Sequence, residues 1–343
     1  MTKARRTNLF FLGLIVFYII ACFFFIPLLP DKFLNNNFGI ILSQMVIALP
    51  GIVYIIGSKG KPLESIRFQR IGFLNVILLV LFTVFMVPTI SFINALSMML
   101  VKNHMTEQLG KMTTNPFWLN LILIAVIPAV VEEMTFRGLL YCGYRDSTIK
   151  RAVFASAFLF GLFHMNINQF CYAAAMAIIF ALLYEATGSL FATMIVHFTF
   201  NANTVVLQKL LDLCQKWVNT LAKTDERFEE IAQQFAESNS STTSFANYAI
   251  TDKISLLGTL FISAVITGTI AFVIFKVLAQ RFHRENHVRQ ILCSLVGRRC
   301  PDRILKENEY IENNNKVYGG KIVDGVFILG VALCIALMIY TGI

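Results

Sequence analysis

Two adjacent glutamates and an arginine, Glu132, Glu133 and Arg137, lie inside a stretch of the chain that is otherwise apolar. The stretch extends from Phe117 to Leu140, and residues 118 to 131 carry no charge. An ionisable side chain near the middle of a membrane-spanning helix costs roughly 2.5 to 3.5 kcal/mol on insertion scales, so such groups usually face a bundle interior and mark a functional site. The pattern therefore predicts chemistry inside a membrane.

The spacing of the three residues indicates how they divide. Residues four apart share a helix face, so Glu133 and Arg137 are placed to pair, whereas Glu132 points about 100° away. In one interpretation, Glu133 and Arg137 neutralise each other and Glu132 faces a cavity as a base. In the other, the pair is purely structural and Glu132 only faces water.

Two histidines in other apolar stretches favour the first of these interpretations, in which Glu132 acts as a base. His164 follows Phe160 by four residues, and His197 precedes Asn201 by four, so each pair shares a helix face. A lone histidine in an apolar helix is more often a satisfied core residue than a functional one. Two such histidines, an aligned asparagine and a glutamate pair on three stretches are harder to explain as packing.

Together these groups suit hydrolysis of an amide bond. A carboxylate and an imidazole can hold and deprotonate a water molecule, while a second imidazole and a carboxamide donate hydrogen bonds to the developing oxyanion. Alternatively, Glu132, His164 and His197 could bind zinc with water in the open position, because two histidines and a carboxylate form a catalytic zinc ligand set. The sequence leaves both the zinc and the metal-free mechanism open.

The composition predicts how these residues are positioned. With 57% hydrophobic and 14% charged residues, and a mean hydropathy of +0.68, the chain is too apolar for a soluble globule of its length. We expect an all-α, polytopic integral membrane bundle. The stretches long enough to span a hydrocarbon core of about 30 Å lie at about 9–29, 38–57, 73–98, 117–140, 151–166, 169–186, 188–211, 254–277 and 325–342.

The basic residues predict the topology. Most of the 29 Lys and Arg fall on one side of these stretches, which places the N-terminus in the cytoplasm by the positive-inside rule. The net charge of +9 is then mainly a topology signal with an affinity for anionic membrane lipid. A nucleic-acid partner is not expected.

One membrane domain with two appended loops is predicted. The domain spans 1–277, has its motif core at 117–205 and contains an inserted outer loop, 212–252, in which Thr224 to Glu237 reads as an amphipathic cap. A charged cytoplasmic loop, 278–324, precedes a C-terminal transmembrane span, 325–343. In that loop, His283 to His287 is not a zinc-binding HExxH, because its glutamate is at the wrong position, and we expect a solvated charged turn.

Taken in order, the three motifs resemble the signature of the CPBP family of CAAX proteases and bacteriocin-processing proteins, also called the type II CAAX prenyl endopeptidase or ABI family. That signature is two glutamates, three variable residues and an arginine, then phenylalanine, three variable residues and histidine, then histidine, three variable residues and asparagine. The resemblance covers Phe117 to Val205. It implies an eight-helix core, to which the last span is an addition.

The resemblance also implies residue roles. Glu132 would activate water together with His164. His197 and Asn201 would form the oxyanion site. Glu133, Arg137 and Phe160 would support these groups. The family is named for metalloproteases, although a metal-free glutamate mechanism has also been argued for it. We therefore expect an intramembrane endopeptidase that hydrolyses a peptide or protein substrate.

Two other functions fit the same residues less well. A non-catalytic immunity or scaffold protein would use the site to bind a peptide or partner, and a transporter would use the buried charges as an ion relay. The phenylalanine-rich, short-looped sequence favours a bacterial cell membrane. Peptide maturation, bacteriocin immunity or signalling would suit that setting.

Overall fold

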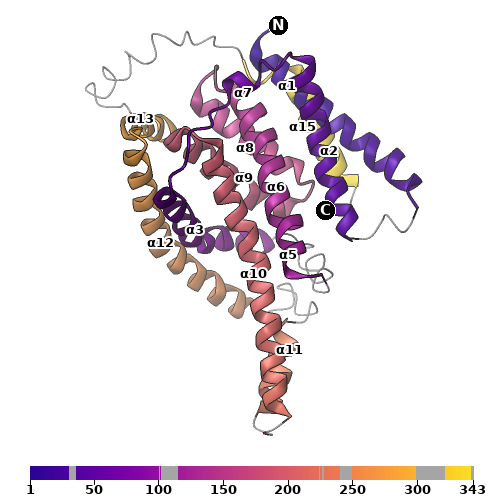
Figure 1. Ribbon diagram of the computed structural model, residues 1–343, viewed down its shortest axis with the longest axis vertical. Helices are drawn as coiled ribbons and strands as arrows, with labels where there is room; N and C mark the ends of the chain where they lie inside the picture. Colours follow the sequence, from indigo (N-terminus) through magenta and orange to yellow (C-terminus); the bar gives the residue numbers. More distant parts are fainter. Residues whose placement is uncertain are drawn as a thin grey trace.

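The computed structural model describes residues 1–30, 36–99, 101, 115–223, 225, 228–239, 249–298 and 321–340, and these form a bundle of helices (Figure 1). The predicted all-α polytopic bundle is confirmed, and the chain is a multi-pass integral membrane protein. Among the described residues, the helices long and apolar enough to cross a membrane are Lys3–Leu28, Asn37–Gly57, Phe73–Met98, Phe117–Tyr144, Ile167–Thr187, Leu190–Ala222 and Ile250–Arg281.

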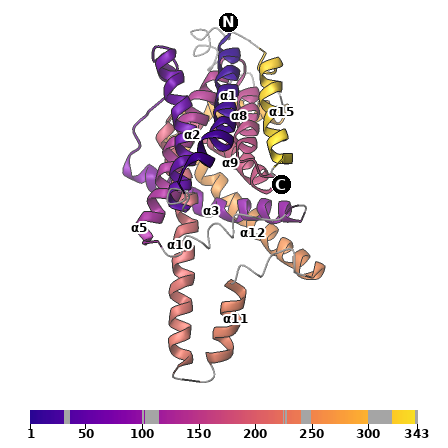
Figure 2. The same cartoon turned by 90° about the vertical axis from the view of Figure 1, so that its right-hand side faces the viewer.

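Within these spans, the regular helices are α1 (Lys3–Ile20), α2 (Asn36–Gly57), α3 (Phe73–Met98), α9 (Ile167–Thr187), α10 (Leu190–Ala222) and α12 (Ile250–Arg281). The predicted fifth and ninth stretches form shorter helices, α8 (Ile149–Phe163) and α15 (Gly325–Tyr340). A helix of this length rises only about 22 to 24 Å, so it needs shelter from longer neighbours. α8 packs along α9, and α15 lies beside α1 in both views (Figures 1 and 2).

The span that carries the glutamate pair is not a regular α-helix. It consists of α5 (Phe117–Asn120), the π-helix η5 (Leu121–Val126), α6 (Ile127–Glu132), the π-helix η6 (Glu133–Tyr141) and α7 (Cys142–Tyr144). The π-helix is rare and is found frequently at functional sites. The second π-helical segment begins at Glu133 and therefore separates the two glutamates into different helical geometries.

The predicted outer loop is largely helical. Instead of ending near residue 211, α10 continues to Ala222, and α11 (Glu229–Asn239) packs back along it as a hairpin that projects from the bundle (Figures 1 and 2). The 33 residues of α10 rise about 50 Å, well beyond a hydrocarbon core of about 30 Å. The expected amphipathic cap is thus one arm of this hairpin, with Val218 and Ala232 buried.

The predicted cytoplasmic loop also contains a helix. α13 (Glu285–Leu295) buries Val288 and Ile291 and packs against α8 and α9. The expected solvated turn at His283 to His287 is wrong for two of its residues, because Arg284 and His287 contact the buried Glu185 of α9. The rest of this loop from residue 299 to 320 and the polar run from 240 to 248 lie outside the described residues.

A close approach of two helices supports the histidine motif. At Gly161 of α8, a Cβ atom would lie 2.9 Å from the backbone oxygen of Phe170 and 3.0 Å from the side chain of Ala174, both on α9. Small residues allow such backbone contacts between helices in a membrane. Gly161 thereby holds Phe160 and His164 against the bundle.

We predict that Gly161→Ala destabilises the protein, because the added methyl group must push α8 away from α9. Overpacking of this kind costs about 1 to 3 kcal/mol of unfolding free energy, measurable as a lower thermal midpoint in detergent. Gly258→Ala in α12 is the matched control, since a Cβ there meets nothing within 4 Å. A midpoint for Gly161→Ala equal to that of the control would contradict the close packing.

Candidate active site

A fully buried carboxylate, Glu133, joins two spans at the centre of the site. Its Oε1 accepts a hydrogen bond from Nδ1 of His197 on α10 at 2.8 Å and contacts Nη1 of Arg137 at 2.9 Å. None of the three side chains is more than 5% exposed. A buried charge is tolerated only when it is paired and hydrogen bonded, and here one carboxylate meets a guanidinium and an imidazole.

Two aromatic rings enclose the guanidinium of Arg137. Its central carbon lies 4.3 Å from the ring centre of Phe160 on α8 and 4.7 Å from that of Phe180 on α9. Cations are attracted to the faces of aromatic rings, and the attraction grows when water is excluded. The ring of Phe180 also lies 5.4 Å from that of His197. Side chains from three other helices therefore converge on the Glu133–Arg137 pair.

Glu132 lies beside this pair in a different environment. Its side chain is 13% exposed, its Oε1 accepts a hydrogen bond from Nε2 of Gln44 at 3.1 Å, and its Oε2 lies 4.0 Å from Nε2 of His197. The last distance is too long for a direct hydrogen bond but is one that a single water molecule can bridge. Because Nδ1 of His197 donates to Glu133, its Nε2 is an acceptor in the neutral imidazole.

His164 directly follows α8 and faces the same cluster. Its Nδ1 donates to the backbone oxygen of Phe160 at 2.8 Å, and the ring packs edge-on against Phe160 at 4.9 Å. The ring of Phe160 lies 6.5 Å from that of His197, so the two histidines flank one phenylalanine. His164 also interacts electrostatically with Glu132 and His197.

Asn201 lies one turn beyond His197 on α10. Its Nδ2 donates to the backbone oxygen of Ile124 in η5 at 3.0 Å. A carboxamide has two N–H donors, so this bond fixes the side chain while using one of them. The structure thus brings all seven residues singled out from the sequence to neighbouring positions on three spans.

The zinc alternative finds no support in this geometry. The described part of the chain contains no group of three His, Cys, Asp or Glu side chains placed to hold a metal ion, and this includes Glu132, His164 and His197. Two ligand atoms of a tetrahedral zinc lie about 3.4 Å apart, shorter than the 4.0 Å between Glu132 and His197. We therefore derive no step through a metal.

Two further residues of the site, Gln44 and Phe180, were not predicted from the sequence. Gln44 is 8% exposed inside the apolar stretch at 38–57, so the argument that singled out the buried glutamates applies to it as well. Phe180 carries no such signal, because a phenylalanine in an apolar helix is ordinarily part of the core. Its position on Arg137 depends on how α9 packs.

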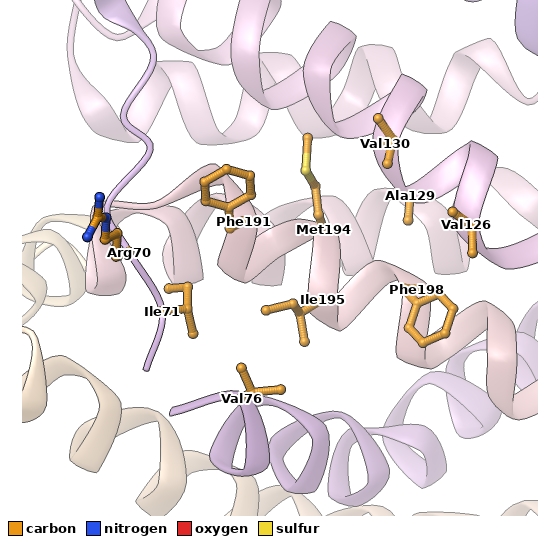
Figure 3. A pocket seen from close by; sticks show the side chains of 10 residues that line it. All are labelled: Arg70, Ile71, Val76, Val126, Ala129, Val130, Phe191, Met194, Ile195 and Phe198. Carbon is orange, nitrogen blue, oxygen red and sulfur yellow. The ribbon is translucent and has the colours of Figure 1, made fainter. Parts of the chain in front are cut away.

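An apolar groove lies between α6, α10 and the start of α3 (Figure 3). It has a volume of about 550 Å³. Its walls flank the site in sequence, since Val130 lies two residues before Glu132 and Met194 lies three before His197. The lining residues are Arg70, Ile71, Val76, Val126, Ala129, Val130, Phe191, Met194, Ile195 and Phe198, and Arg70 is the single charged one.

Comparison with known proteins identifies the segment that contains this site. Residues 114–203 match the family model described as type II CAAX prenyl endopeptidase Rce1-like. Comparisons with the curated proteins and with the solved structures give no match. The matched segment contains all three motifs, so the match confirms the resemblance drawn from them: residues 114–203 are similar to the Rce1-like type II CAAX prenyl endopeptidases, a family of proteases.

Proposed function

We propose that this protein is an intramembrane endopeptidase in which Glu132 activates the attacking water. The observation that carries the proposal is the 4.0 Å separation between Oε2 of Glu132 and Nε2 of His197. Glu133 occupies the other nitrogen of the same imidazole at 2.8 Å. A carboxylate and an oriented imidazole then face each other across the width of one water molecule.

The reaction follows from these positions. Glu132 takes a proton from the water, the hydroxide adds to the substrate carbonyl carbon, and the carbonyl oxygen becomes an oxyanion. The second N–H of Asn201 and a protonated imidazole of the site donate to that oxyanion. Glu132 then returns its proton to the leaving nitrogen as the C–N bond breaks, which yields a carboxylic acid and an amine.

The remaining polar residues position these groups. Glu133 fixes the ring orientation and the tautomer of His197, as a buried carboxylate does for a catalytic histidine. Arg137 neutralises Glu133, and His164 assists Glu132 through its Nε2. Gln44 orients the Glu132 carboxylate at 3.1 Å.

The groove provides access for an apolar substrate. The family name describes endopeptidases of prenylated CAAX proteins, and an apolar groove beside the site suits the apolar part of such a substrate, whether side chains or a lipid chain. We place the chain start and the segments at 59–70, 145–151 and 281–298 on the cytoplasmic side, because each carries three or four Lys and Arg. A bacterial cell membrane is the proposed setting.

The first prediction is that Glu132→Gln lowers the rate of peptide cleavage by about 10² to 10⁴-fold, the usual contribution of a general base. Membrane insertion and the thermal midpoint should change little, because Gln keeps the size and the hydrogen bond to Gln44. A screen of peptide libraries with purified protein measures the rate, and the exposed Glu64→Gln is the control. Full cleavage by Glu132→Gln would overturn the mechanism.

The same variant separates the enzyme from a non-catalytic immunity or scaffold protein. In the scaffold alternative, wild type cleaves no peptide in the screen, and Glu132→Gln retains the protection or binding that wild type provides. Loss of cleavage with retained insertion supports the protease.

The second prediction concerns metal. Because the described residues do not form a ligand set, cleavage by purified protein should remain within about twofold of its starting rate after dialysis against a strong chelator, a change worth only ~0.4 kcal/mol. Elemental analysis of the same sample should find less than one zinc per chain. Loss of activity that added zinc restores would contradict the metal-free mechanism.

The third prediction tests the groove. Val130→Trp should raise KM about tenfold, because the indole fills space that the substrate needs, while kcat changes less. Val130 is 46% exposed, so the larger side chain does not disrupt the core. Val84→Trp on α3 is the control, since Val84 is 51% exposed but does not line the groove. An unchanged KM for Val130→Trp would exclude the groove as the path of the substrate.

A further inference from the structure

A second buried carboxylate, Glu185, lies near the end of α9 and gathers polar partners from three segments. It is 0% exposed. Its Oε1 accepts from Oη of Tyr141 at 2.8 Å and from Nε of Arg145 at 2.6 Å, and its Oε2 accepts from Nη2 of Arg145 at 3.1 Å. Nε2 of His287 and Nη2 of Arg284 contact Oε2 at 2.7 and 3.4 Å.

The strongest of these interactions is the two-pronged one with Arg145. Such bidentate pairs between guanidinium and carboxylate are strong and geometrically specific. Arg145 follows the end of its span, and although burial opposes its charge, Glu185 raises its pKa. For Arg284, burial prevails over the attraction of Glu185 and lowers the pKa. Arg145 is therefore a stronger partner of Glu185 than Arg284 is.

The partners of Glu185 continue the row of residues that forms the active site. Glu133, Arg137, Tyr141 and Arg145 follow one another at intervals of four, and the first three belong to the π-helix η6. At the start of this row, Glu133 contacts His197. At its end, Tyr141 and Arg145 contact Glu185, so the row connects the two buried carboxylates.

α9 touches this row at two places. Phe180 stacks on Arg137 at 4.7 Å, and Glu185, five residues later, binds Tyr141 and Arg145. A π-helix survives only where surrounding contacts favour it over the α-helix. If the segment relaxed to an α-helix, the extra residue that its π-helical turn accommodates would shift into the regular helix. The side chains that precede it would then rotate by about 100° about the helix axis. Glu133 would then leave His197.

We propose that Glu185 is a positioning residue of the protease: by holding Tyr141 and Arg145, it fixes the π-helical register of residues 133–141 and so the orientation of Glu133 toward His197. The inference rests on the proposed peptidase function. Glu185 does not touch the reacting atoms and acts through the row. Arg284 and His287 extend the same junction to α13, which Glu185 therefore ties to the catalytic span.

Two tyrosines on the catalytic span provide a matched test. Tyr141 and Tyr144 are both 0% exposed, and each donates its hydroxyl to a buried side chain, Tyr141 to Glu185 and Tyr144 to Asn8. Tyr141→Phe and Tyr144→Phe each remove one buried hydroxyl from neighbouring turns. Only the first change affects the row.

We expect Glu185→Gln and Tyr141→Phe to lower kcat, by up to about 10²-fold for Glu185→Gln, because a displacement of about 1 Å has that effect on a catalytic group. KM should stay within about threefold, since the substrate groove is untouched. Amide hydrogen exchange of residues 133–141 should become faster in both variants. Tyr144→Phe should change neither kcat nor this exchange.

Three results would overturn the inference: an unchanged kcat per folded molecule in Glu185→Gln, unchanged exchange of 133–141, or equal losses of kcat in Tyr141→Phe and Tyr144→Phe. If Glu185→Gln lowered the thermal midpoint and left kcat and exchange unchanged, Glu185 would have a purely structural role, which would also overturn the inference. If wild type cleaves no peptide, the proposed function fails. Exchange then decides the positioning by itself, and unaltered exchange in Glu185→Gln counts against it.

Discussion

The buried contact between Glu133, Arg137 and His197 is the constraint on which the arrangement of the site depends. Removing one partner of a buried ion pair typically costs about 3 to 5 kcal/mol, because the other charge is left uncompensated, and the membrane interior offers no water as a substitute. The π-helix, the rings of Phe160 and Phe180 and the packing of α10 must therefore place these groups together. Any fold that separated them would leave a charge in an apolar surrounding.

The same constraint explains why two neighbouring glutamates have different surroundings. Glu133 is fully buried and contacts both Arg137 and His197, whereas Glu132 is 13% exposed and has a neutral donor, Gln44. Carboxylates in different environments take different functions even when they are adjacent. The change from α-helix to π-helix between them contributes to this difference, because it directs each side chain to a different neighbour.

Much of this could be predicted from the sequence because the signals are local. Apolar runs located the spans, and the spacing of Glu133 and Arg137 located a pair whose atoms lie 2.9 Å apart. The π-helix could not be foreseen, because it depends on tertiary contacts rather than on the local pattern. Gln44 and Glu185 reach the catalytic span from 88 and 44 residues away, and periodicity says nothing about which distant helices meet. α13 was hidden because a short amphipathic helix in a charged segment differs little from a loop.

The polar row and the apolar groove together show how a charged site is compatible with a lipid surrounding. Glu133, Arg137, Tyr141 and Arg145 face α9 and α10, so each charged member of the row has an oppositely charged partner inside the bundle. The groove next to them is lined by apolar side chains apart from Arg70. A substrate lying in it would exchange one apolar surrounding for another, apart from a contact with Arg70. The free energy needed to remove water from these charged side chains is therefore spent once, when the protein folds and their partners come together. It is not spent again when a substrate binds.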